Sequence, residues 1–361
     1  MEEVLYTVWL STLPGMSADR KLELSRAFGG PKGVYGTAAE ELRELFSRNN
    51  ILSTHGAFLK KLCQKDLSLA EYCLNEAEKT GAAVVTLQSD AYPPLLKGIK
   101  DPPLALFCLG DVSLLKSRCV AVVGTRRASP YGRWAAAEIA KRVSLAGVTV
   151  VSGMAEGIDT AAHTGCLQAG GKTIAVFGTG VDICFPRSNE KLYKQIRENG
   201  LLVSEYPFGE WGKASNFPER NRIIAGLSES CVVAEGAVRS GSLITAGLAA
   251  EQGRGVFALP GNINQPGSAG TNLLISEGVP PIDSMDHALK ILGLEGLPAE
   301  KRSDLSEQEK VLLRHVRGCG SSSKQYICET CSLGAQESSM LLTCLELKGL
   351  VRLEGGQVFI L

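Results

Sequence analysis

CVAVVGTRRASPYG, residues 119–132, is the stretch that decides the fold. Its five leading apolar residues predict a buried strand, Gly124 predicts a tight turn, and a helix is expected to follow. A glycine turn that runs into a helix N-terminus is suited to binding an anion. The spacing of a dinucleotide fingerprint is absent, because Arg126 and Arg127 stand where it needs glycines. Arginine suits phosphate oxygens, so we expect Arg126, next to Thr125, to face a phosphate; Arg127 either does the same or points into solvent.

Similar apolar runs recur on both sides of this stretch, separated by helical patterns and glycine-rich joints. Near-continuous apolar strands of this kind are typical of a parallel sheet covered on both faces. We therefore predict a doubly wound α/β domain over residues 80–292, with its ligand at the carboxyl ends of the strands. The further runs are 83–87, 104–109, 149–152, 173–177, 201–204, 231–234 and 255–259.

Three later loops at the same predicted edge carry glycine, hydroxyl and arginine residues. They contain Arg187 after a glycine turn, then Arg220, Asn221 and Arg222 before a helix, then Ser240, Gly241 and Ser242 at the start of another helix. Between Arg118 and Arg254 there are 16 basic against 12 acidic residues. Several phosphate-sized sites in a row suit a polymer better than a mononucleotide. This hypothesis requires the arginines to lie side by side and to point outward.

The aromatic residues of these loops leave two alternatives open. Phe185 and Phe217 flank the arginines, and Tyr131 follows the first turn. Each is suited either to stacking on a base or to packing in the core.

Acidic and histidine side chains follow the second strand of the core at helical spacing. Glu156, Asp159 and His163 have the spacing of one helix face, which would allow acid–base or metal chemistry. Gly157 interrupts them and Asp159 suits a helix cap, so we predict capping and hydrogen bonding instead. No nucleophile is paired with a base, and we expect no enzymatic activity and no cofactor.

Composition limits the classes of protein to which the chain can belong. The 361 residues include 38 basic and 38 acidic side chains, which excludes binding to nucleic acid through a gross positive field. There is no apolar run of membrane-spanning length, and the start of the chain is acidic, so we expect a cytoplasmic protein without membrane contact. The 11 cysteines are scattered. Cys328 and Cys331 form the only close pair, and they suit the buried face of a short helix better than a zinc site.

Two smaller domains are expected to flank the sheet. Residues 1–79 show helical periodicity, and residues 293–304 read as a linker. Residues 305–361 predict a winged helix: a capping box at Ser306–Glu309, a short helix near 324–331, a longer one near 335–348 and a terminal hairpin. Its charges nearly balance, which argues against a duplex-DNA regulator and favours a protein-contact or regulatory module.

Four groups of residues form one ordered set of motifs: Val123–Arg126 with Tyr131–Gly132, Ser152–Ala155 with Gly157–Asp159 and Ala162–His163, Phe217–Gly226, and Ser240–Ala246. In these motifs the chain resembles the DprA/Smf family of bacterial DNA-processing proteins. The resemblance implies a Rossmann-like domain between a SAM-like or helix-hairpin-helix-like domain and a winged helix. It further implies single-stranded DNA binding, homodimerisation through the Rossmann-like domain, and loading of the RecA recombinase in natural transformation. It makes Arg126, Arg187, Arg220 and Arg222 DNA contacts.

One enzyme class remains as an alternative. Phosphoribohydrolases of the cytokinin-activating type have a distantly similar fold, and Pro260–Gly261 and Gly270–Thr271 invite the comparison. Those enzymes need a compact glycine loop followed closely by glutamates, whereas Glu277 is the nearest acid here. The apolar run Leu273–Ile275 is a candidate dimer surface.

Overall fold

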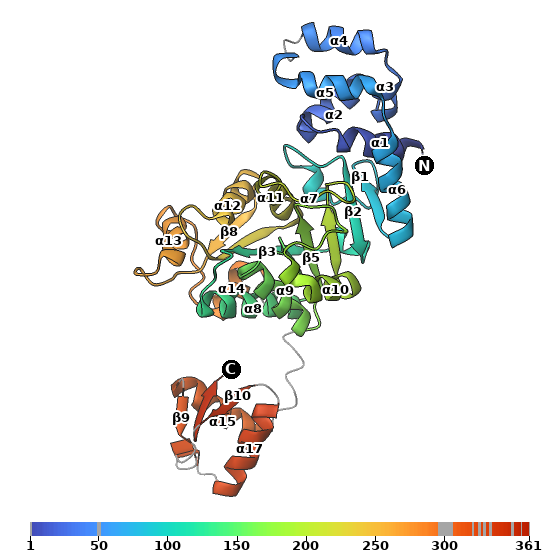
Figure 1. Cartoon of the computed structure of the whole chain (residues 1–361). Coiled ribbons are helices and arrows are strands. Elements are labelled where there is room, and N and C mark those ends of the chain that lie inside the picture. Colours follow the sequence, from blue (N-terminus) through green and yellow to red (C-terminus); the bar gives the residue numbers. More distant parts are fainter. Residues whose placement is uncertain are drawn as a thin grey trace. The chain divides into compact units, whose positions relative to one another are not determined.

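The computed structural model describes residues 2–48, 52–294 and 306–360, apart from positions 320, 324, 325, 328, 329, 332, 333, 348, 349 and 355 in the last range. The chain divides into two compact units, Met1–Leu297 and Pro298–Leu361 (Figure 1). Most of the predicted linker lies outside the described residues.

Six helices open the first unit, as the periodicity of residues 1–79 predicts. Helix α4 is typical: Leu42 and Phe46 are buried one turn apart, while Glu40, Glu41 and Arg48 complement the dipole at its two ends. The helices are α1 (Glu2–Thr12), α2 (Ala18–Ala27), α3 (Pro31–Gly36), α4 (Ala39–Arg48), α5 (Leu52–Gln64) and α6 (Ser68–Thr80).

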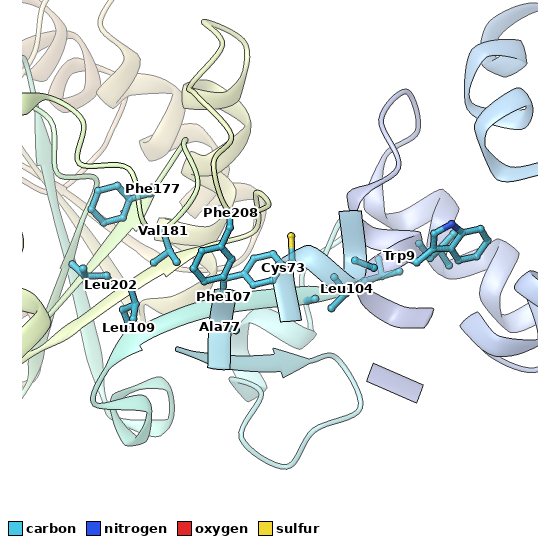
Figure 2. Close-up of a cluster of buried hydrophobic side chains, with 14 of the residues drawn as sticks. Trp9, Cys73, Ala77, Leu104, Phe107, Leu109, Phe177, Val181, Leu202 and Phe208 are labelled. Carbon is cyan, nitrogen blue, oxygen red and sulfur yellow. The ribbon is translucent and has the colours of Figure 1, made fainter. Parts of the chain in front are cut away.

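The apolar core of these helices continues into the sheet. Figure 2 shows buried side chains leading from Trp9 through Cys73 of α6 to Phe107 and Phe208. The Phe107 and Phe208 rings meet edge to face with centroids 5.5 Å apart. A shared core of this kind joins the helices and the sheet into one compact unit.

Eight strands form one mixed sheet in the order β1-β2-β6-β5-β4-β3-β7-β8. Strands β3 to β8 are parallel, and β1 and β2 run antiparallel to their neighbours. The predicted parallel sheet is therefore present, and within it β2 alone runs against the other strands, because apolar runs reveal burial and not strand direction. The strands are β1 (Ala83–Thr86), β2 (Ala105–Gly110), β3 (Cys119–Gly124), β4 (Thr149–Ser152), β5 (Thr173–Phe177), β6 (Leu201–Ser204), β7 (Ser230–Glu235) and β8 (Gly255–Ala258).

Helices cover both faces of the sheet, as predicted for a doubly wound domain (Figure 1). On one face, α8 (Pro130–Leu145), α9 (Ile158–Gln168), α10 (Glu190–Asn199) and α14 (Met285–Ile291) pack against alternate strand residues such as Val120 and Val122. On the other face, α7 (Pro94–Lys97), α11 (Asn216–Leu227) and α12 (Gly241–Glu251) cover Ala121 and Val123. The remaining elements are η1 (Val112–Lys116), η2 (Arg187–Asn189), η3 (Pro266–Ser268) and α13 (Ala269–Ser276).

The second unit has the element order expected of a winged helix. Its predicted capping box is present: Glu309 N donates to Ser306 Oγ at 3.2 Å, and Ser306 N donates to the Glu309 carboxylate at 2.7 Å. The helices α15 (Glu307–Cys319) and α17 (Ala335–Leu347) accompany a sheet of order β10-β11-β9, with β9 (Ser321–Ser323), β10 (Val351–Glu354) and β11 (Gln357–Ile360). The short helix expected near 324–331 lies partly outside the described residues.

Candidate nucleic-acid interface

The turn after β3 is held in place by its own backbone. Thr125 N donates to the Glu235 carbonyl at 2.7 Å, and Ile158 N donates to the Thr125 carbonyl at 3.2 Å. A side chain at position 124 would collide with Ile158, so only glycine fits there. Thr125 Oγ1 accepts a further bond from Arg127 N at 3.2 Å. The turn is therefore fixed before any ligand binds.

Both arginines of this turn point outward. Arg126 and Arg127 are exposed, and the described residues contain no ion pair with either. The Arg126 guanidinium lies 5.5 Å from the centroid of the Phe217 ring, which is a cation–π distance. Phe217 lies in turn 5.4 Å from Phe185, centroid to centroid. The loops before α8, η2 and α11 thus meet at the carboxyl edge of the sheet.

A buried carboxylate supports this turn from below, and the sequence pattern did not reveal it. Glu235 is 4% exposed, and its Oε2 accepts bonds from Ser129 N and Ser129 Oγ, both at 2.9 Å. Ser129 also caps α8 by accepting a bond from Gly132 N at 3.0 Å. A side chain at position 132 or 267 would collide with the Glu235 carboxylate. The glycines at these two positions are the sequence signal for the buried Glu235 carboxylate.

The loop Gly153–Gly157 packs against the same turn. Met154 adopts a positive φ of 60°, and its carbonyl accepts a bond from Asn189 Nδ2 at 2.8 Å. Asp159 accepts bonds from Gly153 N at 3.1 Å and Ala155 N at 3.3 Å. Burial raises the pKa of Asp159, partly offset by Arg220. Asp159 therefore holds the loop by hydrogen bonds, consistent with the structural role predicted for it, although the residue before α9 is Gly157.

His163 also has a structural position. It is fully buried on α9, with Nδ1 2.7 Å from Thr173 Oγ1. Burial, with a smaller contribution from Arg220, lowers the pKa of His163 to about 3. The imidazole is neutral across the physiological range and is closed off from any ligand at the edge.

Arg220 points into the protein, so the expectation that it faces outward is wrong. It is 5% exposed and donates to the carbonyls of Gly153, at 2.9 Å, and Val176. Burial lowers the pKa of Arg220 to about 10, although Asp159 acts in the opposite direction. Asn221 is also buried and donates to the Gly241 carbonyl at 3.3 Å. Helix α11 covers the sheet, and these two side chains lie on its inner side.

Arg222 is held in an internal ion-pair cluster, which corrects its expected outward orientation as well. Its guanidinium bonds both oxygens of Glu205, at 2.7 and 2.6 Å, and Asp101 at 3.0 Å. The side chain is only 12% exposed. The pKa of Arg222 is raised, because attraction to Glu205 and Asp101 exceeds the effect of burial. Lys21 of α2 lies near this cluster, and burial lowers the pKa of Lys21 to about 8.

The other predicted residues divide between the surface and the helix start. Arg187 is exposed at the start of η2, with no ion pair among the described residues, and the neighbouring Ser188 donates to Glu156 at 2.7 Å. Ser240 caps α12 by accepting a bond from Ser242 N at 3.4 Å. Gly241 is exposed and Ser242 is buried. The structure therefore brings Arg126, Arg127 and Arg187 to the surface of the sheet domain as outward-facing cations.

Two further features bear on the range of possible functions. Within the described residues, no three histidine, cysteine or acidic side chains gather as a metal site would require. Cys328 lies outside the described residues, and Cys331 is half-buried. In the part of the chain that the structure describes, no helix combines the length and the apolar character needed to cross a membrane.

The amino-acid sequence is similar to those of several known proteins. The Smf protein of Escherichia coli K12 is 44% identical over 225 residues, 61% of this chain and 60% of the relative's length. DNA processing protein DprA of Streptococcus pneumoniae is 46% identical over 199 residues, 55% of this chain and 70% of the relative. A protein of Mycobacterium tuberculosis H37Rv, named as a putative DNA processing protein DprA, is 31% identical over 340 residues, 89% of this chain and 86% of the relative.

Solved structures agree with these relatives. The X-ray structure of DprA from Streptococcus pneumoniae matches with a TM-score of 0.60 and 36% identity, over 75% of this chain and 97% of that one. A second match is a structure of DprA from Helicobacter pylori, described as giving insight into its unique single-stranded DNA binding mode. It has a TM-score of 0.54 and 32% identity, and the match covers 58% of this chain and 95% of that one.

A family model matches the same region that contains the candidate interface. A family model described as DNA recombination-mediator protein A matches residues 83–293. These residues form the sheet, the outward-facing arginines and the helices around them. The resemblance drawn from the sequence motifs is confirmed, and the chain belongs to the DNA recombination-mediator protein A family.

Proposed function

We propose that this protein binds single-stranded DNA at the carboxyl edge of its sheet. The observation that carries the proposal is the turn after β3, where Arg126 is exposed and without a carboxylate partner among the described residues. Arg127 and Arg187 supply further outward-facing cations, and Ser240–Ser242 supply the N-terminal end of α12. The Helicobacter pylori relative, described by its single-stranded DNA binding mode, supports the same assignment.

The chemistry of this edge suits the DNA backbone better than particular bases. A guanidinium group donates to phosphate oxygens in a fork, and each neutralised phosphate releases counterions. Such contacts are strongly salt-dependent and insensitive to sequence. Because Thr125 and Ile158 fix the turn through backbone bonds, binding requires little reorganisation.

Arg220 and Arg222 take a different role in this proposal. Arg220 holds the loop Gly153–Gly157 from inside and Arg222 joins α11 to Glu205, while Arg126, Arg127 and Arg187 make the contacts. Asn221 ties α11 to the first turn of α12. The DNA-binding set predicted from the sequence thus divides into contacting and positioning residues.

The wider biology follows from the family. We infer that the protein protects incoming strands in the cytoplasm, passes them to the RecA recombinase and acts as a homodimer. Exposed apolar residues of α12, α13 and the loop between β8 and η3, namely Ile244, Leu273 and Ile263, offer a surface for dimerisation. The protein would act by binding and not by catalysis.

The phosphoribohydrolase alternative finds no support at its key positions. Gly261 N donates to Asn272 Oδ1 at 3.1 Å, and Gly270 N donates to the Gly236 carbonyl at 2.7 Å. Thr271 is 1% exposed, and its hydroxyl donates to the Ser268 carbonyl. These groups are engaged within the fold, so they do not offer a nucleotide-binding loop.

Replacing Arg126 with alanine tests the proposal. Anisotropy of a fluorescein-labelled oligothymidylate should show affinity weakened by about tenfold to 100-fold, since a hydrogen bond to a charged group contributes roughly 1.5–3 kcal/mol. The slope of log affinity against log salt should also become shallower by about one.

The control is Arg43→Ala on α4, an arginine that is also exposed and forms an ion pair with Glu40 at 3.5 Å. Its affinity should equal that of the wild type. If Arg126→Ala also binds like the wild type at every salt concentration, this edge is not the DNA site.

A further inference from the structure

The loop between β6 and α11 exposes a tryptophan. Trp211 is 58% exposed, more than any other aromatic side chain in the described part of the first unit. An indole ring is large, flat and rigid, so an exposed one can stack on the face of a nucleic-acid base. Trp9, by contrast, is 1% exposed in the helical core.

The backbone on both sides of Trp211 is anchored to the carboxyl edge of the sheet. Gly180 N, just after β5, donates to the Glu210 carbonyl at 2.8 Å. Gly209 N donates to both carboxylate oxygens of Asp182 at 3.1 Å. The ring is therefore presented from a fixed position and not from a loose loop.

The residue after Trp211 contacts the ring that carries Arg126. A β-carbon at Gly212 would lie 2.9 Å from Phe217 Cζ, so the Gly212 backbone lies against that ring. Phe217 lies under the Arg126 guanidinium, and its ring centroid is 5.4 Å from that of Phe185. Trp211 is thus one residue from the aromatic contact at the centre of the proposed interface.

We infer that Trp211 is a stacking platform for an unpaired base of the bound strand, next to the phosphate held by Arg126. The inference rests on the proposed function and extends it to the bases. An indole face accepts any base, which fits binding without sequence preference. In a duplex the faces of internal bases are already stacked, so a platform of this kind favours single strands.

The test combines a side-chain change with a change in the DNA. Trp211→Ala should bind an oligothymidylate roughly fivefold to 100-fold more weakly than the wild type, and Trp211→Phe should retain most of the affinity. With an abasic oligonucleotide of the same length, the wild type and Trp211→Ala should bind equally. The control is Trp134→Ala, an indole 52% exposed on α8 beside Tyr131, which should bind like the wild type.

Fluorescence gives a second measurement on a protein that keeps Trp211. In a Trp134→Phe variant, only Trp211 and the buried Trp9 remain as indoles. Adding the oligothymidylate should quench the emission, and adding the abasic oligonucleotide should not.

The outcomes separate this inference from the function on which it rests. If Arg126→Ala weakens binding and Trp211→Ala does not, the platform is overturned and the DNA site stands. If neither variant weakens binding, both fail. If Trp211→Ala loses the same affinity on the abasic strand, the indole contacts the backbone and stacking is refuted.

Discussion

Two pairs of arginines at the same edge of the sheet have opposite positions. Arg126 and Arg127 point outward from the turn after β3, whereas Arg220 and Arg222 point inward from α11. The backbone of the turn is satisfied by other backbone groups, so its side chains are free to meet a ligand. Helix α11 lies on the sheet, and its arginines meet carbonyl groups and carboxylates instead.

An arginine at the carboxyl edge of the sheet is therefore not, by its position alone, available to bind an anion. Buried charges require partners, and Arg222 has two carboxylates while Arg220 has carbonyls and the nearby Asp159. An outward arginine without an ion pair keeps its hydrogen-bonding capacity for an anion. The inner pair should therefore affect stability most, and the outer pair should affect binding most.

Removing Arg222 should cause the largest change in the free energy of unfolding. Arg222→Met leaves Asp101 and Glu205 without the cation that compensates them, and breaking a buried pair in this way costs about 3–5 kcal/mol. Urea denaturation should show this loss in the free energy of unfolding. DNA affinity of the folded fraction should change little by comparison with Arg126→Ala.

The triple variant Asp101→Asn, Glu205→Gln, Arg222→Met is the control, because it removes the guanidinium together with its two carboxylate partners, while Lys21 keeps its bond to the Ser11 carbonyl. It should be more stable than Arg222→Met alone, since no carboxylate is left unpaired. If Arg222→Met unfolds like the wild type, the cluster contributes nothing and the contrast between the two arginine pairs is lost.

The second-largest effect is expected at the buried His163, which makes the free energy of unfolding depend on pH. Burial lowers the pKa of His163 from 6.5 to about 3 in the folded state. Below pH 6.5 the unfolded chain binds a proton that the folded chain does not, so the free energy of unfolding decreases as the pH falls toward 3. The linkage is about 1.4 kcal/mol per pH unit, or roughly 3 kcal/mol by pH 4.

A His163→Asn variant, measured by urea denaturation from pH 7 to pH 4, isolates this contribution. Carboxylates titrate in the same range, so the difference between the wild type and the variant is the informative quantity. That difference should shrink as the pH falls, because only the wild type loses the histidine contribution. A constant difference across the range would show that His163 is protonated in the folded state.

Local sequence patterns predicted the parts of the fold that depend on neighbouring residues. The eight apolar runs became eight strands, and the Ser306–Glu309 capping box formed as expected, because burial and capping are decided within a few residues. The reversed direction of β2 was not predictable, since it depends on which strands β2 pairs with.

The candidate site was predictable only in part for the same reason. Arg126 could be placed because its turn is encoded next to it. Arg222 could not, because its partner Asp101 lies 121 positions earlier in the chain. Glu235 reads as an ordinary residue after a strand, and only the glycines at positions 132 and 267 show that space is kept for its carboxylate.

The smallest expected effect concerns the outward-facing pair, Arg126 and Arg127. Thr125 Oγ1 accepts a hydrogen bond from Arg127 N at 3.2 Å, a side-chain contact within the arginine turn itself. Thr125→Val keeps the shape and removes the acceptor, which costs about 0.5–1.5 kcal/mol for one hydrogen bond. Thr125→Ser keeps the acceptor.

Because the proposed contacts of Arg126 and Arg127 with DNA form best on a turn that is already in place, Thr125→Val should weaken oligothymidylate binding by roughly twofold to fivefold. Thr125→Ser should bind like the wild type, and both variants should unfold within about 1.5 kcal/mol of the wild type. If the valine and serine variants bind equally, the backbone bonds to Glu235 and Ile158 alone hold the arginines. The outward orientation of this pair would then depend on the sheet and not on the side chain of the turn.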